Sequence, residues 1–545
     1  MPVINIVLED LNRMLKVKLS SNDFANIIPK IGADPDEIND SEADEINDSE
    51  AVVEFFPDRP DLLSTEGVAR ALRAFTEQTL GLIEYEIHPP STQIFVSHEV
   101  MEIRPSISGG IVRGVTLDNL SIKCIMELQE KLHLTLGRKR KKVSIGIHDL
   151  SKLEGPFNYE TCSPHEPAFV PLQKDYEMTP QEILEEHPKG IEYAHLLSEF
   201  NRYPIIKDSN DEVASMPPII NGALTTITED TTDVLIDVTG LDDNAVESCV
   251  NIVAAALVER GGKIEQIELK FPSENKIAPS MNPKVHEIEN DYLIKLLGFD
   301  PGQFVIFKAF RKCGMEPELK GDRWSVKVPA YRADILHPID LVEEVSIGIG
   351  YDEFPESLPT ETLFGKSLKS RKQEDNCRET MLGLGFQEVV TLTLTSKKML
   401  HEFTQREHDN ETEVANPVTE DYHLLRSSIL PNLLELLKNN KHRELPQQVF
   451  EIGQIVKMHT NVQSLAWMQI ASKNTFSQAR TISDSIALRL RISGETKECE
   501  DPLFIPGRCI EIRSGRILLK YGEIHPFTLE KFELGYPVIG GEIHW

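Results

Sequence analysis

The chain contains 545 residues, carries a formal net charge of −31 and is 40% hydrophobic. This length predicts roughly three to four domains with ordinary buried cores. The acidity argues against a dedicated nucleic-acid-binding protein, because phosphate contacts need Lys and Arg, and no apolar run reaches the ~18 residues that cross a bilayer.

The cysteines and the first residues indicate a reducing compartment. The seven cysteines are scattered and form no CxxC pair, which is typical of a reduced, cytosolic protein without zinc. The opening residues MPVINIVLEDLNRMLK lack a basic segment followed by an apolar one, so we expect no signal peptide. We therefore expect a cytoplasmic protein that does not associate with a membrane.

Residues 1–85 are predicted to form a small α/β module. Ser20 begins a run of helix-starting residues before Phe24. Residues 51–75, AVVEFFPDRPDLLSTEGVARALRAF, are typical of a strand, a Pro-bounded turn and a helix that begins at Ser64.

An acidic tandem repeat interrupts this module. The octamer DEINDSEA stands at 36–43 and again at 44–51, and residues 31–54 contain ten acids and no Lys or Arg. We expect a solvated surface loop at 34–51, lengthened by duplication. A calcium site is the alternative, but the central Gly and the closing spacing of an EF-hand loop are missing.

Residues 90–270 are predicted to form a second α/β region that is rich in strands. Apolar residues alternate in KKVSIGIHD (141–149) and in DVLIDVTG (233–240), as in β-strands. A helix is expected from about Asn244 until Gly261-Gly262.

Two polar features lie in this region. Asp237 and Thr239 should leave their strand on the face opposite its valines, which predicts either a polar site or a solvent-facing edge. The only dense basic run is Arg138-Lys139-Arg140-Lys141-Lys142, which either contacts RNA phosphates or forms a solvated turn. His148 is expected to be structural at a strand end.

Residues 275–355 are predicted to form a winged-helix-like module in the order helix, helix, hairpin, helix. The first helix should end at Gly298, and Asp300-Pro301 should start the second. The last helix should run from Pro338 to Gly350. Its acidity would repel a duplex, so we expect no DNA binding.

Four carboxylates cluster around that last helix. Asp340, Glu343 and Glu344 stand at i, i+3 and i+4, and Asp334 precedes them. All-oxygen ligation suits Mg²⁺. The alternative is an acid-rich first turn that the helix dipole favours.

Residues 360–545 are predicted to be mixed α+β. A helix is expected near 371–384, followed by a strand EVVTLTLT (388–395). A second helix near 432–440 precedes a strand that ends in FEIG.

Several of these segments, in this order, resemble the β subunit of phenylalanyl-tRNA synthetase of the shorter archaeal/eukaryotic type. The N-terminal module of that family is similar to FFPDRPDLLSTEGVARALRAF (55–75). Its editing module is similar to GRKRKKVSIGIHD (137–149), MPPIING (216–222) and VLIDVTG (234–240). Its metal-binding module is similar to VPAYRADILHPIDLVEEVSIGIGYDEF (328–354).

The resemblance implies an α+β multidomain chain with four modules. These are an N-terminal module (1–85), a tRNA-editing module (90–270), a winged-helix-like, Mg²⁺-binding module (275–355) and a catalytically inactive module like a class II synthetase (360–545). The inactive module lacks the Arg-bearing segments that would hold ATP. We expect the chain to lack the extra N-terminal and C-terminal modules of the long bacterial form. The acidic repeat, in turn, is not part of the family's pattern.

The resemblance also implies a function. With an α subunit, in an α2β2 heterotetramer, the chain would attach phenylalanine to its tRNA using ATP. Its own pocket would hydrolyse tyrosine that has been attached to that tRNA by mistake. The family's pattern assigns Asp237 and Thr239, and less directly Ser215 and Asn221, to this editing pocket. It assigns Asp334, Asp340, Glu343 and Glu344 to Mg²⁺.

Two alternatives remain open at this point. One is an architectural subunit whose editing pocket is inactive. The other is a free-standing tRNA-editing hydrolase, in which 360–545 should have no large apolar surface that needs a second chain.

Overall fold

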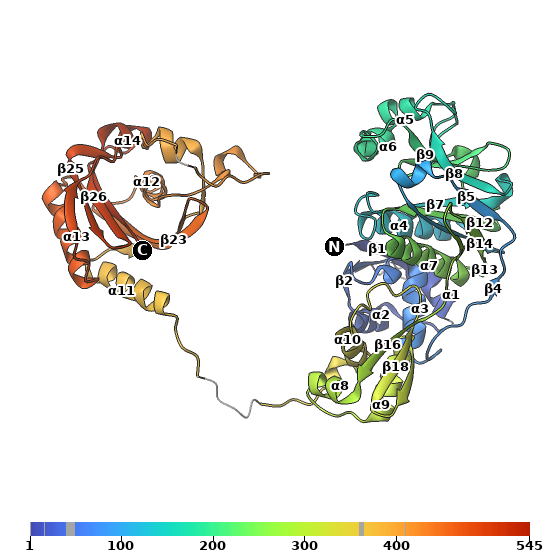
Figure 1. The fold of residues 1–545 in the computed structure, drawn as a ribbon. Helices are drawn as coiled ribbons and strands as arrows, with labels where there is room; N and C mark the ends of the chain where they lie inside the picture. Colours follow the sequence, from blue (N-terminus) through green and yellow to red (C-terminus); the bar gives the residue numbers. More distant parts are fainter. Residues whose placement is uncertain (1, 16, 40–49, 359–363, 409) are drawn as a thin grey trace. The chain divides into compact units, whose positions relative to one another are not determined.

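The chain folds as two units, Met1–Leu358 and Pro359–Trp545, each with its own sheets and cores (Figure 1). The computed structural model describes residues 2–545 except 16, 40–49, 359–363 and 409. The predicted mixed α/β multidomain architecture is confirmed. Among the described residues, no helix combines the length and the apolar character that a membrane crossing requires.

The N-terminal module has a three-stranded sheet in the order β1-β3-β2, with three α-helices beside it. Both predicted helix starts are confirmed, because Ser20 and Ser64 cap α2 and α3 with their side chains. The elements are β1 Val3–Val7, α1 Leu8–Leu15, α2 Ser21–Ile27, β2 Ala33–Asn39, β3 Glu50–Phe55 and α3 Thr65–Phe75.

The acidic repeat is not a loop throughout, so the predicted loop at 34–51 is wrong at its two ends. Strand β2 pairs with β3 in an antiparallel register that reaches Asn39 opposite Glu50. The buried side chains of Ala51, Val53 and Phe55 alternate along β3. Strand β2, which contains the start of the acidic segment, pairs with β3 and forms the edge of the sheet. The remaining repeat positions, 40–49, lie outside the described residues.

The region that follows contains a five-stranded and a seven-stranded sheet. The first has the order β4-β13-β6-β12-β7 and the second β11-β10-β9-β8-β5-β14-β15. The strands of the first are β4 Ile87–His88, β6 Ser106–Arg113, β7 Val143–Asp149, β12 Asp233–Gly240 and β13 Lys263–Glu265. Those of the second are β5 Gln93–Val96, β8 Phe157–Cys162, β9 Tyr203–Lys207, β10 Val213–Met216, β11 Ile220–Asn221, β14 Ile267–Lys270 and β15 Asn275–Ala278.

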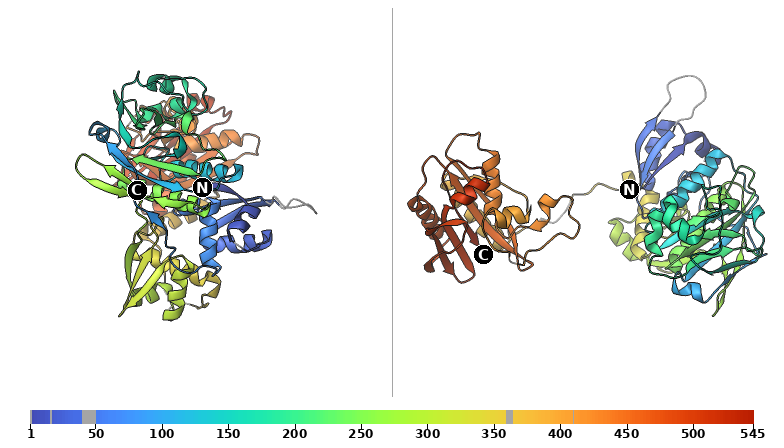
Figure 2. Two further views of the ribbon diagram at one scale, coloured as in Figure 1. Left: turned by 90° about the vertical axis from the view of Figure 1, so that its right-hand side faces the viewer. Right: turned by 90° about the horizontal axis from the view of Figure 1, so that it is seen from above.

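Helices cover one face of the five-stranded sheet. The helices α4 (Asn119–Leu134) and α7 (Asp243–Glu259) pack side by side on it (Figure 2). Helix α7 confirms the helix that was predicted from about Asn244. Two further helices, α5 (Pro180–Glu186) and α6 (Pro188–Tyr193), lie next to the seven-stranded sheet in the same hydrophobic cluster as β9 and β10.

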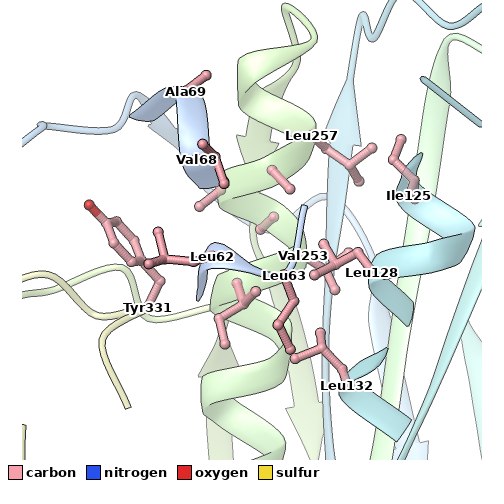
Figure 3. Packing of buried hydrophobic residues seen from close by; sticks show 14 of the residues in the cluster. Leu62, Leu63, Val68, Ala69, Ile125, Leu128, Leu132, Val253, Leu257 and Tyr331 are labelled. Atoms are coloured by element: carbon pink, nitrogen blue, oxygen red, sulfur yellow. The ribbon is translucent and has the colours of Figure 1, made fainter. Parts of the chain in front are cut away.

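One core joins the N-terminal module to this region. Leu63 and Val68 pack with Val253 of α7 and Leu128 of α4 (Figure 3). Tyr331, which follows the hairpin of the third module, packs in the same hydrophobic cluster. The first three predicted modules therefore belong to one compact unit.

The third module begins with a strand that was not predicted. Strand β16 (Lys284–Glu289) pairs with β18, so the expected first helix is confined to α8 (Asn290–Leu297). The second helix, α9, begins at Gln303 rather than at Pro301, because Asp300 accepts a hydrogen bond from the Gly302 N–H and forms a turn there (2.9 Å). The remaining elements are α9 Gln303–Lys312, β17 Glu316–Lys320, β18 Arg323–Val328 and α10 Pro338–Ile349.

The second unit is built on a seven-stranded sheet in the order β19-β22-β23-β27-β26-β25-β24. The predicted strand at 388–395 is wrong in its middle, because β19 ends at Glu388 and β20 begins at Leu394. Between them, two side chains bond the backbone: Asn432 donates to the carbonyl of Leu392 (3.0 Å) and Glu451 accepts from the N–H of Thr391 (3.2 Å). Its helices are α11 Lys369–Gly383, α12 Leu430–Asn439, α13 Phe476–Arg489 and α14 Pro526–Lys531. Its strands are β19 Gln387–Glu388, β20 Leu394–Thr395, β21 Leu424–Leu425, β22 Gln447–Lys457, β23 Thr460–Ile470, β24 Glu495–Glu498, β25 Phe504–Ser514, β26 Ile517–Ile524 and β27 Val538–His544.

Candidate editing pocket

Strand β12 places Asp237 in the interior of the first unit. The strand pairs with β6 on one side and β7 on the other, so it is central rather than the solvent-facing edge that was the alternative. Asp237 lies opposite Gly109 and Gly146 on these two neighbours. A Cβ at Gly146 would lie 2.2 Å from Asp237 Oδ2, so the space for the carboxylate exists only because this residue is glycine.

The Asp237 carboxylate accepts hydrogen bonds from two distant segments. His148, on β7, places its Nε2 2.6 Å from Asp237 Oδ2. Ser215, on β10, donates its hydroxyl to the same oxygen at 3.2 Å. All three residues are at most 3% exposed, so solvent competes little with these bonds.

The other nitrogen of His148 defines its role. Nδ1 lies 2.8 Å from the hydroxyl of Thr225, which also lies 3.2 Å from the carbonyl of Gly222. Both ring nitrogens of His148 are therefore within hydrogen-bonding distance of a buried polar side chain. The result is a Ser215–Asp237–His148–Thr225 chain of buried polar groups. Sequence reasoning assigned only a structural role to His148, and its place opposite Leu235 on the neighbouring strand appears only with the strand register.

A cavity of about 390 Å³ opens beside this chain. This volume is within the range of small-molecule sites. Four consecutive β7 residues, Ser144–Ile147, line it, so the cavity follows the free edge of that strand. The apolar wall consists of Ile122, Met126, Ile145, Ile147, Ile219, Ile220 and Ile227. Three of the four predicted pocket residues, Ser215, Asn221 and Asp237, line the cavity.

Helix α4 supplies a second polar group to the cavity wall. His133 accepts the Ile145 N–H at Nε2 (2.9 Å), and its Nδ1 faces Glu130 at 3.4 Å. Nε2 carries no proton because it accepts this hydrogen bond, and burial lowers the pKa of the ring. The hydrogen bond from His133, aided by the Arg140 guanidinium, lowers the pKa of Glu130 to about 2. The cavity therefore has a fixed anionic carboxylate at this wall.

Thr239 does not line the cavity, although it was predicted to do so. It is fully buried, and its hydroxyl accepts from Arg104 Nε at 2.8 Å and lies 3.0 Å from Ser144 Oγ. Arg104 also donates to the carbonyls of Arg140 and Lys141, and its burial lowers its pKa to about 10. Thr239 thus positions Arg104, whose hydrogen bonds connect β12 with the turn before β7.

The basic run is divided between two roles. Arg138, Lys139 and Lys141 are exposed. Arg140 is buried, donates to the carbonyl of Ile219 (2.7 Å) and to Glu130 (2.7 Å), and lies over the ring of Tyr193. Lys142 pairs with Asp242 at 3.3 Å.

The four predicted Mg²⁺ ligands do not converge on one point. Asp334 and Glu344 both pair with Arg332, which is 3% exposed and donates to Asp334 at 2.8 and 2.6 Å. Asp340 accepts the backbone N–H groups of Leu336 and His337 (2.8 and 2.7 Å) and so caps α10. An arginine already neutralises two of the four carboxylates.

Glu343 is the one predicted ligand that faces solvent. Partial burial, together with the carboxylates of Glu344, Asp58 and Asp340, raises its pKa. That unbalanced negative charge would attract a cation. However, Glu343 is the only one of these four described carboxylates that is not already paired, so a cation there would have a single carboxylate ligand. The residues therefore do not fit a Mg²⁺ site in this arrangement.

Comparisons with known families agree with this organisation. Residues 1–78 match the "Phe-tRNA synthetase beta subunit B1 domain", and 111–269 match the "B3/4 domain". Residues 286–351 match the "tRNA synthetase B5 domain", and 354–545 match the "Phenylalanyl tRNA synthetase beta chain CLM domain".

The relatives that match along the full length include archaeal proteins. The chain is 43% identical over 550 residues to the phenylalanine–tRNA ligase beta subunit of Methanosarcina barkeri, which covers 100% of this chain and 98% of the relative. The subunit from Methanocaldococcus jannaschii is 39% identical over 554 residues, covering 100% of both. An N-terminal fragment of the phenylalanyl-tRNA synthetase beta subunit from Pyrococcus horikoshii superposes with a TM-score of 0.61 at 36% identity, covering 64% of this chain and 99% of that one. The chain belongs to the family of phenylalanine–tRNA ligase beta subunits.

Proposed function

We propose that this chain, in complex with an α subunit, proofreads phenylalanine–tRNA ligation in the cytoplasm by hydrolysing tyrosyl-tRNA in the cavity beside Asp237. The observation that carries the proposal is the 390 Å³ cavity with an apolar wall and two separate polar groups. An aromatic side chain requires the apolar wall, whereas a phenol and an ester each require polar partners.

The two polar groups suit different ends of a tyrosyl ester. Glu130 and Asp237 lie on different elements, α4 and β12, and both line the cavity. In this proposal the Glu130 carboxylate accepts the phenol hydrogen bond and is left unpaired when phenylalanine enters, which gives discrimination. The Ser215–Asp237–His148–Thr225 chain holds the ester or the attacking water.

The free edge of β7 adds backbone groups. The N–H and carbonyl of Ile145 point away from β12, since they bond to His133 and Gln129. Backbone groups alternate along a strand, so those of Ile147 point the same way. Ile147 therefore presents an N–H that can bind the substrate's carbonyl oxygen.

The proposal assigns adenylation to the α subunit, with ATP and Mg²⁺ bound in that chain. Large apolar side chains on the second unit support a partner there, because Val390, Leu392 and Val418 are at least 59% exposed. This favours a subunit of an α2β2 heterotetramer over a free-standing hydrolase. The exposed residues Arg138, Lys139 and Lys141 are the proposed contacts to tRNA phosphates.

The test is deacylation of purified tyrosyl-tRNA by the α–β complex, with phenylalanine charging measured in parallel. Asp237→Asn and Ser215→Ala should slow deacylation roughly ten- to a hundred-fold, because each loses a hydrogen bond of about 1–3 kcal/mol, and should leave charging intact. Asp233→Asn is the matched control, on the same strand but outside the cavity.

Two outcomes would overturn the proposal. Unchanged deacylation in both variants would place editing elsewhere. ATP–pyrophosphate exchange by the isolated chain would show that adenylation does not need the α subunit.

A further inference from the structure

A histidine-rich cluster lies in the second unit, outside the machinery described above. His401 lies in the short π-helix η8 (Lys398–Glu402), and His408 and Glu411 follow it in the chain. His401 is 5% exposed, whereas His408 is exposed. Neither the absence of CxxC pairs nor the spacing of the histidines indicated this cluster in the sequence.

The three side chains converge closely. One ligand atom from each lies within 4.8 Å of the other two, and no other trio of His, Cys, Asp or Glu meets this condition among the described residues. His401 Nε2 is 2.7 Å from Glu411 Oε1, and the two imidazole rings are 4.2 Å apart between centroids.

His401 is under-satisfied in this position. Although Nε2 is close to Glu411, neither ring nitrogen meets the directional requirement of a hydrogen bond to any described residue. A buried polar group without a hydrogen bond is costly, which indicates a missing partner. The imidazole nitrogen of histidine is the commonest metal ligand in proteins.

The surrounding chain holds the cluster in place from both sides. Arg406, between the two histidines, makes a two-pronged pair with Asp501 at 2.9 and 2.8 Å. Lys397, before η8, pairs with Glu413 at 2.7 Å. The segment that carries the ligands is thus anchored independently of any ion, and such preorganisation favours metal binding.

We propose that His401, His408 and Glu411 form a binding site for a divalent transition metal of the Zn²⁺ class. Two imidazoles and one carboxylate suit Zn²⁺ and leave a fourth position for water. Ligand atoms around a tetrahedral Zn²⁺ lie about 3.3 Å apart, so the His401–Glu411 pair would open by roughly half an ångström. The bound ion would link His408 and Glu411 to η8, independently of the proposed editing activity.

The experiment is a titration of Zn²⁺ alone into the metal-stripped, full-length chain by calorimetry. The wild-type chain should bind one equivalent at this site. His408→Ala and Glu411→Gln should each weaken binding by more than roughly tenfold, because a lost ligand costs at least as much as the outer-shell contacts that contribute 10–100-fold. His442→Ala, at an exposed histidine of the same unit, is the matched control and should bind as the wild-type chain does.

A second measurement separates binding from misfolding. Zn²⁺ should raise the melting temperature of the wild-type and His442→Ala chains but not that of His408→Ala, which has the same circular dichroism without metal. Absence of stoichiometric binding, or equal affinity in the wild-type, His408→Ala and Glu411→Gln chains, would overturn the proposal.

Discussion

The polar cluster around Asp237 holds one carboxylate in the first unit, and the acidic cluster at the start of α10 holds four, but the partners of these carboxylates differ. Asp237 accepts hydrogen bonds from His148 and Ser215 and lines a cavity. Asp334 and Glu344 are instead paired with one buried arginine.

The difference follows from where each carboxylate's partners come from. Asp237 is on a central strand, and its partners come from segments 89 and 22 residues away. The four acids at the start of α10 are close in sequence, and local groups pair with three of them. Arg332 pairs with Asp334 and Glu344, and the N–H groups before the helix donate to Asp340. Carboxylates that are neighbours in sequence are therefore not necessarily a coordination sphere. Five changes test this contrast and the fold around it.

Removing Arg332 should have the largest effect on stability. Arg332→Ala leaves Asp334 and Glu344 without their counter-charge, which should cost about 3–5 kcal/mol of unfolding free energy in urea titrations of the full chain. Arg323→Ala removes an exposed ion pair and is the control, with about 1 kcal/mol or less. If millimolar Mg²⁺ restored the stability of Arg332→Ala, the freed carboxylates would be a metal site after all.

Thr239→Val should cost stability rather than editing. It leaves Arg104 Nε without its acceptor, at about 1–3 kcal/mol, while the cavity lining is unchanged. The measurement is the urea midpoint alongside tyrosyl-tRNA deacylation, with Thr116→Val at an exposed position as control. Lost deacylation with an unchanged midpoint would show that Thr239 contacts the substrate, as the sequence predicted.

Changes at the start of α10 should distinguish a helix cap from a metal ligand. Asp340→Ala should cost about 1 kcal/mol, because two N–H groups lose their acceptor. Glu343→Gln should cost nothing at neutral pH. The pKa of Glu343 is raised in the folded chain, so its ionisation opposes folding as the pH rises, and the substitution removes that effect. Melting temperatures with and without Mg²⁺ are the measurement, and a loss of Mg²⁺-dependent stabilisation in either variant would support the magnesium prediction.

Deleting residues 44–51 should have the smallest effect. The first repeat copy supplies Glu42-Ala43 in place of Glu50-Ala51, so the deletion leaves the amino-acid sequence of β3 unchanged. Loop-closure entropy changes slowly with length, and we expect a shift below about 0.6 kcal/mol in thermal unfolding. A larger loss would mean that the repeat makes contacts elsewhere in the chain.

The sequence alone determined the elements with strong local signals. Ser20 and Ser64 marked helix starts, Gly261 and Gly350 marked helix ends, and the alternation in 233–240 marked β12. These features depend on capping, left-handed backbone and period-2 burial within a few residues.

Tertiary structure alone decided which polar groups act together. The pairing of Asp237 with His148 depends on strand register, and the exclusion of Thr239 from the cavity depends on Arg104, which is 135 residues away in the chain. Likewise, the sequence did not show that the side chain of Arg332 donates to Asp334 and Glu344, which leaves these two carboxylates paired with an arginine. Local spacing places a side chain on a face, but burial and long-range partners determine what that side chain can bind.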